Sequence, residues 1–591
     1  MPDAPTSPAA SKLSRPQASF TQFKTLAGAF FSSESGRRRA RIWLALLLLF
    51  SLTVAAVQVL MSYAGRDFMT AIANRDEAGY GRTLWRYLGT FALAVPIGVF
   101  YRFAEQRLGL LWRQWLTQHL MKRYFFNRAY YRLRGSTTID NPDQRISEDV
   151  KNFTTGTLSF LLIALNSLVT LIAFIGVLWS INATLVGVLF GYAFFGTVIS
   201  ILIGRRLVGL YYLQYQREAD FRHGLIRVQD NAESIAFYRG EKREHLDLVT
   251  RLISVVDNTF AIIGWSRNLA FFTNSYNYAA LVLPVVVVAP LFMHHKVEFG
   301  VVLQAVGAFA QVLAALSLII AQFEVLSSFS AGVARLGALC DNLDEFDAEE
   351  AHETAHSQID VEQAGRLCLE NLTVRTPDGK KTLVKGLTLT LQPGQSVVLM
   401  GDSGTGKSSL LRTVAGLWPS AGGSISRPPL KDMIFLPQRP YMVPGTLRDQ
   451  LLYPLPEGNI DDRALENVMR RVNLKDVFDR VDGDFSAVVD WTNVLSLGEQ
   501  QRVSFARLLL REPRVAFLDE ATSALDEGNE KHLYEELRKM GCAYISVGHR
   551  DTLKEYHELV LVLHKGGKSE LTKTGSREVR KLSGPAATLK A

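Results

Sequence analysis

Long uncharged runs of apolar residues dominate the first half of the chain. Residues 42–63 carry no charge and have the length of one membrane span, because about 20 helical residues cross the hydrocarbon core. A second uncharged run, residues 87–101, is shorter and contains Pro96, so its helix should extend beyond both ends. Residues 152–204 contain no charged side chain, which is too long for one span. This pattern predicts several membrane helices before residue 340.

The polar segment at residues 180–184 divides the longest run into spans near 158–179 and 185–203, and further spans lie near 274–293 and 301–323. Arginine-rich segments precede the first span and separate spans two from three and four from five. The connections after spans three and five are short and poor in arginine. Because cytoplasmic loops are enriched in Arg and Lys, six spans with both termini in the cytoplasm satisfy every loop.

Composition and charge agree with a membrane protein. The 591 residues are 48% hydrophobic and only 21% charged, with a formal net charge of +8. The arginines gather beside apolar runs, which favours a lipid bilayer as partner over a nucleic acid. The three cysteines, Cys340, Cys368 and Cys542, are far apart, so neither a disulfide framework nor a zinc site is expected.

The segments outside the spans suggest five parts. The predicted organisation is a disordered Pro/Ser/Ala-rich tail (1–19), a six-helix transmembrane domain (20–340), an acidic linker without apolar periodicity (341–366), a soluble domain (367–565) and a mobile basic tail (566–591). Apolar residues recur at helical spacing from Phe20 to Phe31. This helix could lie in the membrane interface or pack on the first span.

Two cytoplasmic connections are long enough to hold helices that continue beyond the bilayer. At the tip of each, a turn-forming polar stretch adjoins a short apolar helix, which could dock into a groove of another domain. The candidate residues are Asp140, Asn141, Pro142, Asp143 and Arg145 in the first tip and Glu233, Phe237 and Tyr238 in the second.

Residues 401–408, GDSGTGKS, fit the phosphate-binding loop pattern G-x-x-x-x-G-K-[ST]. A short apolar strand precedes them and a helix follows, as this motif requires. Glycines let backbone N–H groups and the helix N-terminus face the anionic oxygens of ATP, and Ser408 can bind Mg²⁺. The predicted nucleotide-binding residues are Gly401, Ser403, Gly404, Thr405, Gly406, Lys407, Ser408 and Ser409.

Polar residues follow three further strand-like segments. Asp519 and Glu520 end the apolar run 515–518, where Asp519 suits Mg²⁺ and Glu520 can orient or deprotonate the attacking water. Gln438 and His549 each follow another short apolar run, and both could reach the γ-phosphate, with Gln438 a third candidate Mg²⁺ ligand. Alone, each would be an ordinary strand-end residue. Their order around the phosphate loop favours a catalytic site with Glu520 and His549 in the catalytic roles.

Residues 495–502, LSLGEQQR, resemble the signature segment of the ABC transporters, and 523–526, SALD, resemble their D-loop. Gln438 and His549 fall at that family's Q-loop and switch positions. With six spans in front, the chain is similar to a half-size ABC transporter. The resemblance implies an exporter-like helical membrane domain followed by an α/β P-loop ATPase with a helical subdomain. It also implies a homodimer in which Ser496, Gly498 and Glu499 of one copy complete the ATP site of the other.

Departures from the family pattern narrow the resemblance. Leu497 stands where the signature has its first glycine, and Thr376 stands where many members stack an aromatic residue on adenine, so base recognition should be weaker or come from elsewhere. These features, the Trp491–Val494 segment and both loop tips resemble the peroxisomal fatty-acyl transporters and their bacterial relatives, including SbmA/BacA-like proteins. In that subgroup the two loop tips act as coupling helices.

The resemblance implies an ATP-driven transporter in a bacterial inner membrane that takes up bulky hydrophilic cargo, such as peptides or cobalamin-like compounds. Fatty-acyl-CoA transport is the alternative. A non-transporting regulator is a further one, which the presence of Lys407, Asp519, Glu520 and His549 disfavours. The polar span residues could line a cavity or form interhelical hydrogen bonds; they are Gln58, Asn166, Asn274, Gln304 and Gln311.

Overall fold

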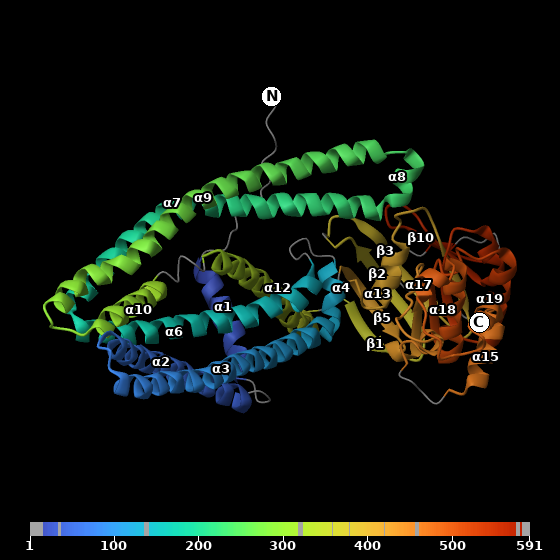
Figure 1. Cartoon of the computed structure of the whole chain (residues 1–591). Helices are drawn as coiled ribbons and strands as arrows, with labels where there is room; N and C mark the ends of the chain where they lie inside the picture. The colour runs from blue at the N-terminus through green and yellow to red at the C-terminus, as the bar shows by residue number, and fades with distance from the viewer. Residues whose placement is uncertain are drawn as a thin grey trace, which may run out of the picture. The chain divides into compact units, whose positions relative to one another are not determined.

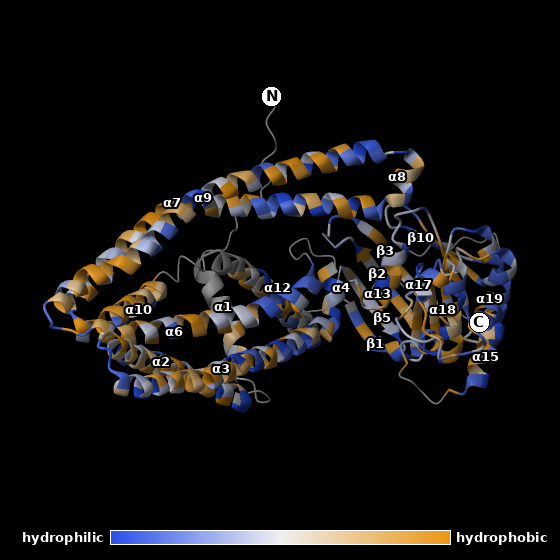
Figure 2. Cartoon of the chain, in the orientation of Figure 1, coloured by the Kyte–Doolittle hydropathy of each residue, from blue (hydrophilic) through white to orange (hydrophobic). Residues whose placement is uncertain are grey.

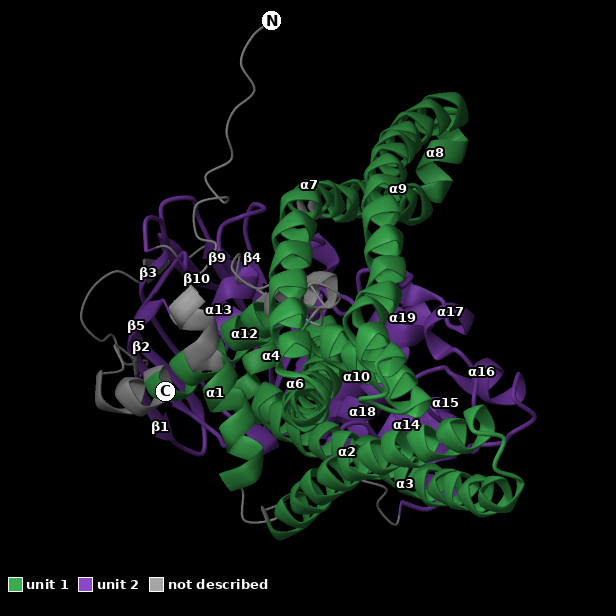
Figure 3. Cartoon of the chain, turned by 60° about the vertical axis from the view of Figure 1, so that its left-hand side comes forward, with its two compact units in different colours: residues 1–350 green, residues 351–591 purple. Residues whose placement is uncertain are grey.

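The computed structural model forms two compact units, residues 1–350 and 351–591 (Figure 3). It describes residues 16–32, 37–134, 141–316, 323–356, 359–377, 379–418, 420–455, 460–574 and 580–581. The predicted tail at 1–15 and the candidate coupling residue Asp140 lie outside the described residues.

The first unit is entirely helical in its described part (Figure 1). Among the described residues of this unit, six helices contain a stretch long and apolar enough to cross a membrane, which confirms the predicted number of spans. They are α2 (Arg37–Ala73), α3 (Glu77–Phe125), α6 (Val150–Ile181), α7 (Ala183–Asp230), α9 (Glu241–Met293) and α10 (Phe299–Leu316). The other long helices are α1 (Pro16–Ser32) and α12 (Phe323–His356).

Helices α7 and α9 extend well beyond a bilayer. Their 48 and 53 residues correspond to roughly 70–80 Å at a rise of about 1.5 Å per residue, against a hydrocarbon core of about 30 Å. The two helices run side by side and are joined by α8 (Ala232–Tyr238) (Figure 1). Their hydropathy changes from apolar near α10 to polar near α8 (Figure 2), as expected for helices that leave the membrane.

Asn182 ends α6 and begins α7, so the predicted break within the longest apolar run is confirmed. Its backbone is extended, and its side-chain Oδ1 accepts a hydrogen bond of 2.8 Å from the Thr184 N–H. The carboxamide thereby satisfies one of the N–H groups that a helix start leaves without a partner. A polar cap therefore separates the two spans within the polar segment 180–184.

Asn166 of α6 joins three spans by hydrogen bonds. It accepts one from the Ser51 hydroxyl on α2 and donates one of 2.7 Å to the Tyr101 hydroxyl on α3. For this residue, interhelical bonding is therefore the correct alternative. Asn274 and Gln311 are instead exposed on α9 and α10.

Helix α1 packs on other helices of the first unit. Phe30 is only 2% exposed, and its ring stacks on Trp112 of α3 with centroids 5.7 Å apart. Phe23 contacts Phe153 of α6 edge-on at 5.9 Å. The partners of α1 are thus α2, which is the first span, and α3, with a ring contact to α6, so the predicted packing on the first span is confirmed. The helix begins at Pro16, so residues 16–19 belong to it and not to a disordered tail.

The second unit contains a four-stranded sheet, in the order β1-β5-β2-β3, and a seven-stranded sheet, in the order β11-β10-β9-β4-β8-β7-β6. The first sheet comprises β1 (Ile359–Gln363), β2 (Leu367–Arg375), β3 (Thr382–Leu391) and β5 (Ala421–Arg427). The second comprises β4 (Ser396–Met400), β6 (Met433–Leu436), β7 (Val515–Asp519), β8 (Ala543–Val547), β9 (Leu559–Leu563), β10 (Ser569–Lys573) and β11 (Arg580–Lys581). Strands β9, β4, β8, β7 and β6 are parallel.

Helices complete the second unit, as expected for an α/β fold. Between β6 and β7 the chain forms a helical subdomain, which confirms that part of the predicted fold. Its helices are α14 (Leu447–Leu452), α15 (Asp462–Arg471), α16 (Lys475–Asp479), α17 (Trp491–Val494) and α18 (Leu497–Arg511). Helix α13 (Lys407–Val414) follows β4, and α19 (Glu527–Met540) follows β7.

The boundaries of this unit differ from the predicted ones at both ends. The acidic segment from 341 is helical as far as His356, because it continues α12. β1 then pairs in parallel with β5, with Val361 opposite Ile425, so the sheet starts before residue 367. β10 pairs with β9 beyond residue 565, so the tail begins later than predicted. Short, charged strands such as these carry little hydrophobic pattern.

His557 is buried between α19 and β8 in a neutral form. Its Nδ1 lies 2.6 Å from the Leu553 carbonyl oxygen, which can only accept, so Nδ1 carries the proton. Its Nε2 then accepts from the Ser546 hydroxyl at 2.8 Å. Burial lowers the pKa of His557 from 6.5 to about 4, although the hydrogen bond to Leu553 opposes this shift.

Acidification should therefore weaken the second unit. Between pH 6.5 and 4 the unfolded chain binds a proton that folded His557 does not, so this group's contribution is complete above pH 6.5 and is lost toward pH 4. From pH 7 to 5 we expect a loss of about 2 kcal/mol, or roughly 4–8 °C in Tm. The measurement is thermal unfolding of the detergent-solubilised chain, compared with His557→Gln. An equal pH dependence in both proteins would contradict the assignment.

Candidate functional site

Four parallel strands bring the candidate residues to one edge of the seven-stranded sheet. In the register of this sheet, Leu399 of β4 lies opposite Val547 of β8, and Val547 lies opposite Asp519 of β7. Leu436 of β6 lies opposite Leu518 of β7. The residues that follow these strand ends therefore meet, as ligand-binding residues do at the carboxyl ends of parallel strands. They are Gly401, His549, Glu520 and Gln438.

The phosphate loop depends on glycines at two crowded positions. Gly401 has φ +141° and Gly406 has φ +99°, values that favour glycine. A Cβ at Gly401 would lie 2.3 Å from the Leu563 carbonyl oxygen, and one at Gly406 would lie 2.8 Å from Leu383 Cβ. The loop thus forms a close backbone cradle that opens onto the N-terminus of α13, which suits a nucleotide's phosphates.

Lys407 lies within this loop. Its Nζ donates to the carbonyl oxygens of Gly401, at 2.7 Å, and Asp402, at 3.0 Å. Burial lowers the pKa of Lys407, and the carboxylates of Glu520 and Asp519 oppose the shift. The ammonium is therefore held at the mouth of the cradle. Thr405 is also buried, Ser408 and Ser409 are half-buried, and Ser403 and Gly404 are exposed.

The carboxylates of Asp519 and Glu520, at the end of β7, lie beside the phosphate loop. The Ser408 hydroxyl donates to Asp519 Oδ1 at 3.2 Å, so the two candidate Mg²⁺ ligands are in contact. Glu520 accepts from Gln438 Nε2 at 2.6 Å and lies 3.4 Å from His549 Nε2. The structure thus brings the predicted catalytic pair and the third candidate metal ligand together.

The backbone at Glu520 is left-handed, with φ +51°. Such a conformation costs a non-glycine residue about 1–3 kcal/mol and clusters at functional sites. Here it turns the chain sharply after β7, and the Glu520 N–H bonds the Val547 carbonyl at 3.1 Å. The turn lets the carboxylate lie between Gln438 and His549.

The signature segment begins α18 with a capping box. Ser496 Oγ and its backbone N–H both lie 2.9 Å from Glu499 Oε2, and the Glu499 N–H returns a bond to Ser496 Oγ. Arg480 forms an ion pair with the same carboxylate. Burial acts to raise the pKa of Glu499, but bonds from Ser496 and Arg480 outweigh it and the pKa is lowered. Glu499 thus caps α18 within its own chain, and its contact with the nucleotide of a second copy stays a prediction.

Gly498 packs against the D-loop, residues 523–526. A Cβ there would lie 3.1 Å from the Ala524 carbonyl oxygen. Leu497, in contrast, is exposed. Position 497, where the chain departs from the family pattern, thus has room for a side chain. Position 498, where the glycine is retained, does not. Thr376 lies in the β2–β3 hairpin, where its hydroxyl accepts from the Lys381 N–H at 3.1 Å.

Sequence reasoning missed Gln501, the second glutamine after Glu499. It is fully buried on α18 and hydrogen-bonds residues of three loops in the site. The residue itself was visible within LSLGEQQR, where Gln501 lies about 1.4 helical turns after Ser496. Pattern alone cannot show which of two neighbouring glutamines points inward.

The loop tips of the first unit differ from one another. In α8, Phe237 and Tyr238 are 78% and 87% exposed, and Glu233 is exposed as well. In the first tip, Pro142 begins the short helix α5 (Pro142–Gln144), with Asn141 left-handed before it and Asp143 in its first turn. Asn141 and Asp143 are exposed.

The position of Arg145 differs from the prediction that this residue is available for docking. Its guanidinium is buried and donates to the Arg335 carbonyl of α12 at 2.7 Å. Arg335 in turn donates to the buried Asp149 at 2.6 Å. Arg145 therefore fixes the tip to α12 within the first unit, and its charge is not presented for docking. Sequence alone gave no sign that this one charge of the tip points inward.

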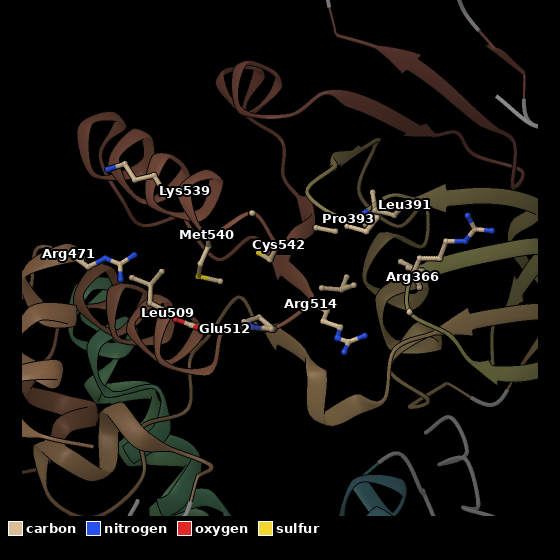
Figure 4. A pocket seen from close by; sticks show the side chains of 16 residues that line it. Arg366, Leu391, Pro393, Arg471, Leu509, Glu512, Arg514, Lys539, Met540 and Cys542 are labelled. Carbon is tan, nitrogen blue, oxygen red and sulfur yellow. The ribbon is translucent and has the colours of Figure 1, made fainter. Parts of the chain in front are cut away.

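A pocket of about 580 Å³ lies at the opposite edge of the sheet, where β7 and β8 begin (Figure 4). Arg471, Lys539, Arg514 and Cys542 are among its lining residues, and none of the predicted nucleotide-binding residues is. Arg471 and Lys539 both pair with Glu536, at 2.7 and 2.6 Å, so the two cations share one carboxylate. The pocket is therefore distinct from the nucleotide site.

Two family models match the chain. Residues 29–293 match the ABC transporter transmembrane region 2, and residues 384–523 match the ABC transporter domain. The first covers five of the six candidate spans, and the second includes the phosphate loop, the signature segment and Glu520. The switch residue His549 lies beyond the second match.

Several proteins are similar along most of the chain. An uncharacterized ABC transporter ATP-binding protein of Synechocystis is 44% identical over 93% of this chain and 84% of its own length. The chloroplastic ABC transporter D family member 2 of Arabidopsis thaliana is 39% identical over 91% and 85%. The human lysosomal cobalamin transporter ABCD4 is 34% identical over 85% and 88%. The chain therefore belongs to the ABC transporter family, as a half-size, ATP-hydrolysing member related to the D-family and bacterial transporters.

Proposed function

We propose that this chain forms a homodimeric, ATP-driven importer of bulky hydrophilic cargo in a bacterial inner membrane, with both termini in the cytoplasm. The observation that carries the ATP-driven part is the meeting of Ser408, Asp519, Glu520, Gln438 and His549 at one sheet edge. A chain with six candidate spans and this site has the parts of a transport cycle. Bacterial relatives along most of its length support the location.

In the proposed reaction, the phosphate-loop glycines and Lys407 bind the ATP phosphates. Ser408, Asp519 and Gln438 are oxygen donors that suit Mg²⁺, which neutralises phosphate charge when bound. Glu520 orients the attacking water and accepts its proton. His549, 3.4 Å from Glu520, fixes the carboxylate and can reach the γ-phosphate. Ser496 and Gly498 of a second copy complete each site.

Coupling to the membrane rests on the exposed tips. A pair of aromatic side chains as exposed as Phe237 and Tyr238 is typical of a docking surface, because tyrosine and phenylalanine are enriched in interfaces. We infer that α8 and the Asn141–Asp143 turn bind the ATPase units. Closure of those units on ATP then moves the long helices α7 and α9, and access to the cargo site alternates.

The cargo proposal rests on relatives and on polar span residues. The human relative is named a lysosomal cobalamin transporter, which supports a cobalamin-like compound, with peptides as a further class. Asn274 and Gln311 are exposed on their spans, which suits a hydrophilic passage. Fatty-acyl-CoA is the competing cargo, since D-family proteins are also among the relatives.

Glu520→Gln should abolish turnover while leaving ATP binding intact. The amide keeps the shape of the side chain but cannot accept the proton, so we expect kcat to fall by about 10²–10⁴-fold. ATPase rates and ATP affinity of the purified chain provide the measurement. Glu527→Gln, an exposed carboxylate in the first turn of α19, is the control and should hydrolyse ATP at the native rate. Native turnover by Glu520→Gln would show that the assigned base is wrong.

Phe237→Ala with Tyr238→Ala should uncouple ATP hydrolysis from transport. Removing the two exposed rings takes away apolar contact area at the proposed docking surface, but it leaves the nucleotide site unchanged. We expect basal ATPase activity within about twofold of native and cargo transport lowered about tenfold or more. Leu246→Ala, an exposed apolar residue on α9, is the control. Unchanged transport by the double variant would argue against coupling through α8.

Reconstituted protein should transport cobalamin or peptide in an ATP-dependent, one-sided manner. Proteoliposomes with sorted orientation are loaded with labelled cobalamin, labelled peptide or fatty-acyl-CoA, and movement is followed with and without ATP. Movement of the hydrophilic cargo toward the ATPase side is the expected result. Movement of acyl-CoA alone would replace the cargo proposal, and ATPase activity with ion conductance but no cargo movement would support a regulator.

A further inference from the structure

The side chain of Gln501 forms several hydrogen bonds to the catalytic loops, none of which is needed to form the helix that contains it. Its Nε2 lies 3.4 Å from the Gln438 carbonyl oxygen, 3.4 Å from the Glu520 carbonyl oxygen and 3.2 Å from Ser523 Oγ. Its Oε1 accepts from the Ala524 N–H at 3.1 Å. One carboxamide thus connects α18 with the loop after β6, the turn after β7 and the D-loop. Its exposed fraction is 0%.

The D-loop is also held from its other side. Arg550, the residue after His549, donates to the carbonyl oxygens of Ser523 and Leu525, both at 3.0 Å. Arg550 also lies 3.7 Å from Glu530, which is 1% exposed and accepts from the Thr522 hydroxyl at 2.6 Å. The D-loop therefore lies between the signature helix and the segment of the switch histidine.

The contact between Gln501 and the Glu520 carbonyl oxygen helps to hold the unusual backbone conformation of Glu520. Its left-handed conformation, φ +51°, persists only where the surroundings fix it. The Glu520 N–H is fixed by β8 through Val547, and its carbonyl oxygen faces Gln501. Because Gln501 also contacts the carbonyl of Gln438, it sets the backbone of both residues whose side chains meet at 2.6 Å.

We propose that Gln501 is a positioning residue for ATP hydrolysis. It transmits the position of the signature helix to Glu520 and the D-loop. This inference rests on the proposed function, in which Ser496 at the start of α18 contacts the ATP bound by the second copy. A displacement of that helix by ATP at one site then reorients Glu520 at the other. Gln501 acts through the loops that it holds by hydrogen bonds.

A second buried glutamine provides a matched control. Gln450 of α14 is also 0% exposed. It accepts from the Val443 N–H at 3.0 Å and donates to the carbonyl oxygens of Val443 and Thr446. Its burial and hydrogen bonding match those of Gln501, but none of its partners belongs to the nucleotide site. A merely structural amide should behave as Gln450 does.

The test compares Q501L and Q450L in the full-length chain in proteoliposomes. For each variant, Tm, ATP affinity, KM and kcat are measured. Both changes leave buried backbone groups without partners, so both should lower Tm. Q501L should lower kcat by roughly 10–100-fold, the range for a misplaced catalytic group, with ATP affinity and KM within about twofold of native. Q450L should keep the native kcat.

Equal kcat in Q501L and Q450L, whether native or lowered, would overturn the proposal. If Q501L does not fold, Q501E takes its place. That change keeps the size and the acceptor for the Ala524 N–H but removes the donors to Gln438 and Glu520, so the same loss of kcat is expected. If Glu520→Gln still hydrolyses ATP, the proposed function itself has failed. A dead Glu520→Gln beside fully active Gln501 variants identifies a failure of this inference alone.

Discussion

The parallel register of β4, β8, β7 and β6 is the constraint on which the nucleotide site depends. These strands are buried and apolar, so their hydrogen bonding fixes where each one ends. Their carboxyl ends lie at one edge, so the first one or two residues after each strand lie at that edge as well. Residues more than 140 positions apart, such as Gly401 and His549, thereby become neighbours. Loops that leave a rigid edge can hold chemistry that no single segment could assemble.

Buried polar side chains then connect that edge to the helical subdomain. Gln501 and Arg550 hold the D-loop from opposite sides, and the cap at Ser496 and Glu499 fixes the start of α18. Each bond satisfies a backbone group that would be costly to bury alone. The left-handed turn at Glu520 is stable within this frame. The strained backbone of Glu520 and the side chains that support it therefore form one connected set of contacts.

The membrane unit follows a different constraint. Without water in the bilayer, backbone groups must be bonded within continuous helices, so the spans are long and uninterrupted. Beyond the hydrocarbon region the same helices become polar and carry the tips. The two tips are not equivalent, because Arg145 anchors the first to α12 whereas α8 exposes its aromatic side chains. The first tip is therefore fixed within its own unit, whereas the second presents an exposed aromatic surface.

The sequence by itself determined the number of spans, the break at Asn182, the family and the residues of the phosphate loop, β7 end and switch. These features give local or periodic signals, because the length of an uncharged run, the end of an apolar strand and the spacing of glycines can each be recognised in the order of the residues. Only the tertiary structure decided that Arg145 points inward, that Glu499 caps its helix, that α1 packs on α3 and that Gln501 reaches three loops. Those facts depend on which side of a helix faces a neighbour distant in sequence, and a linear pattern does not specify that neighbour.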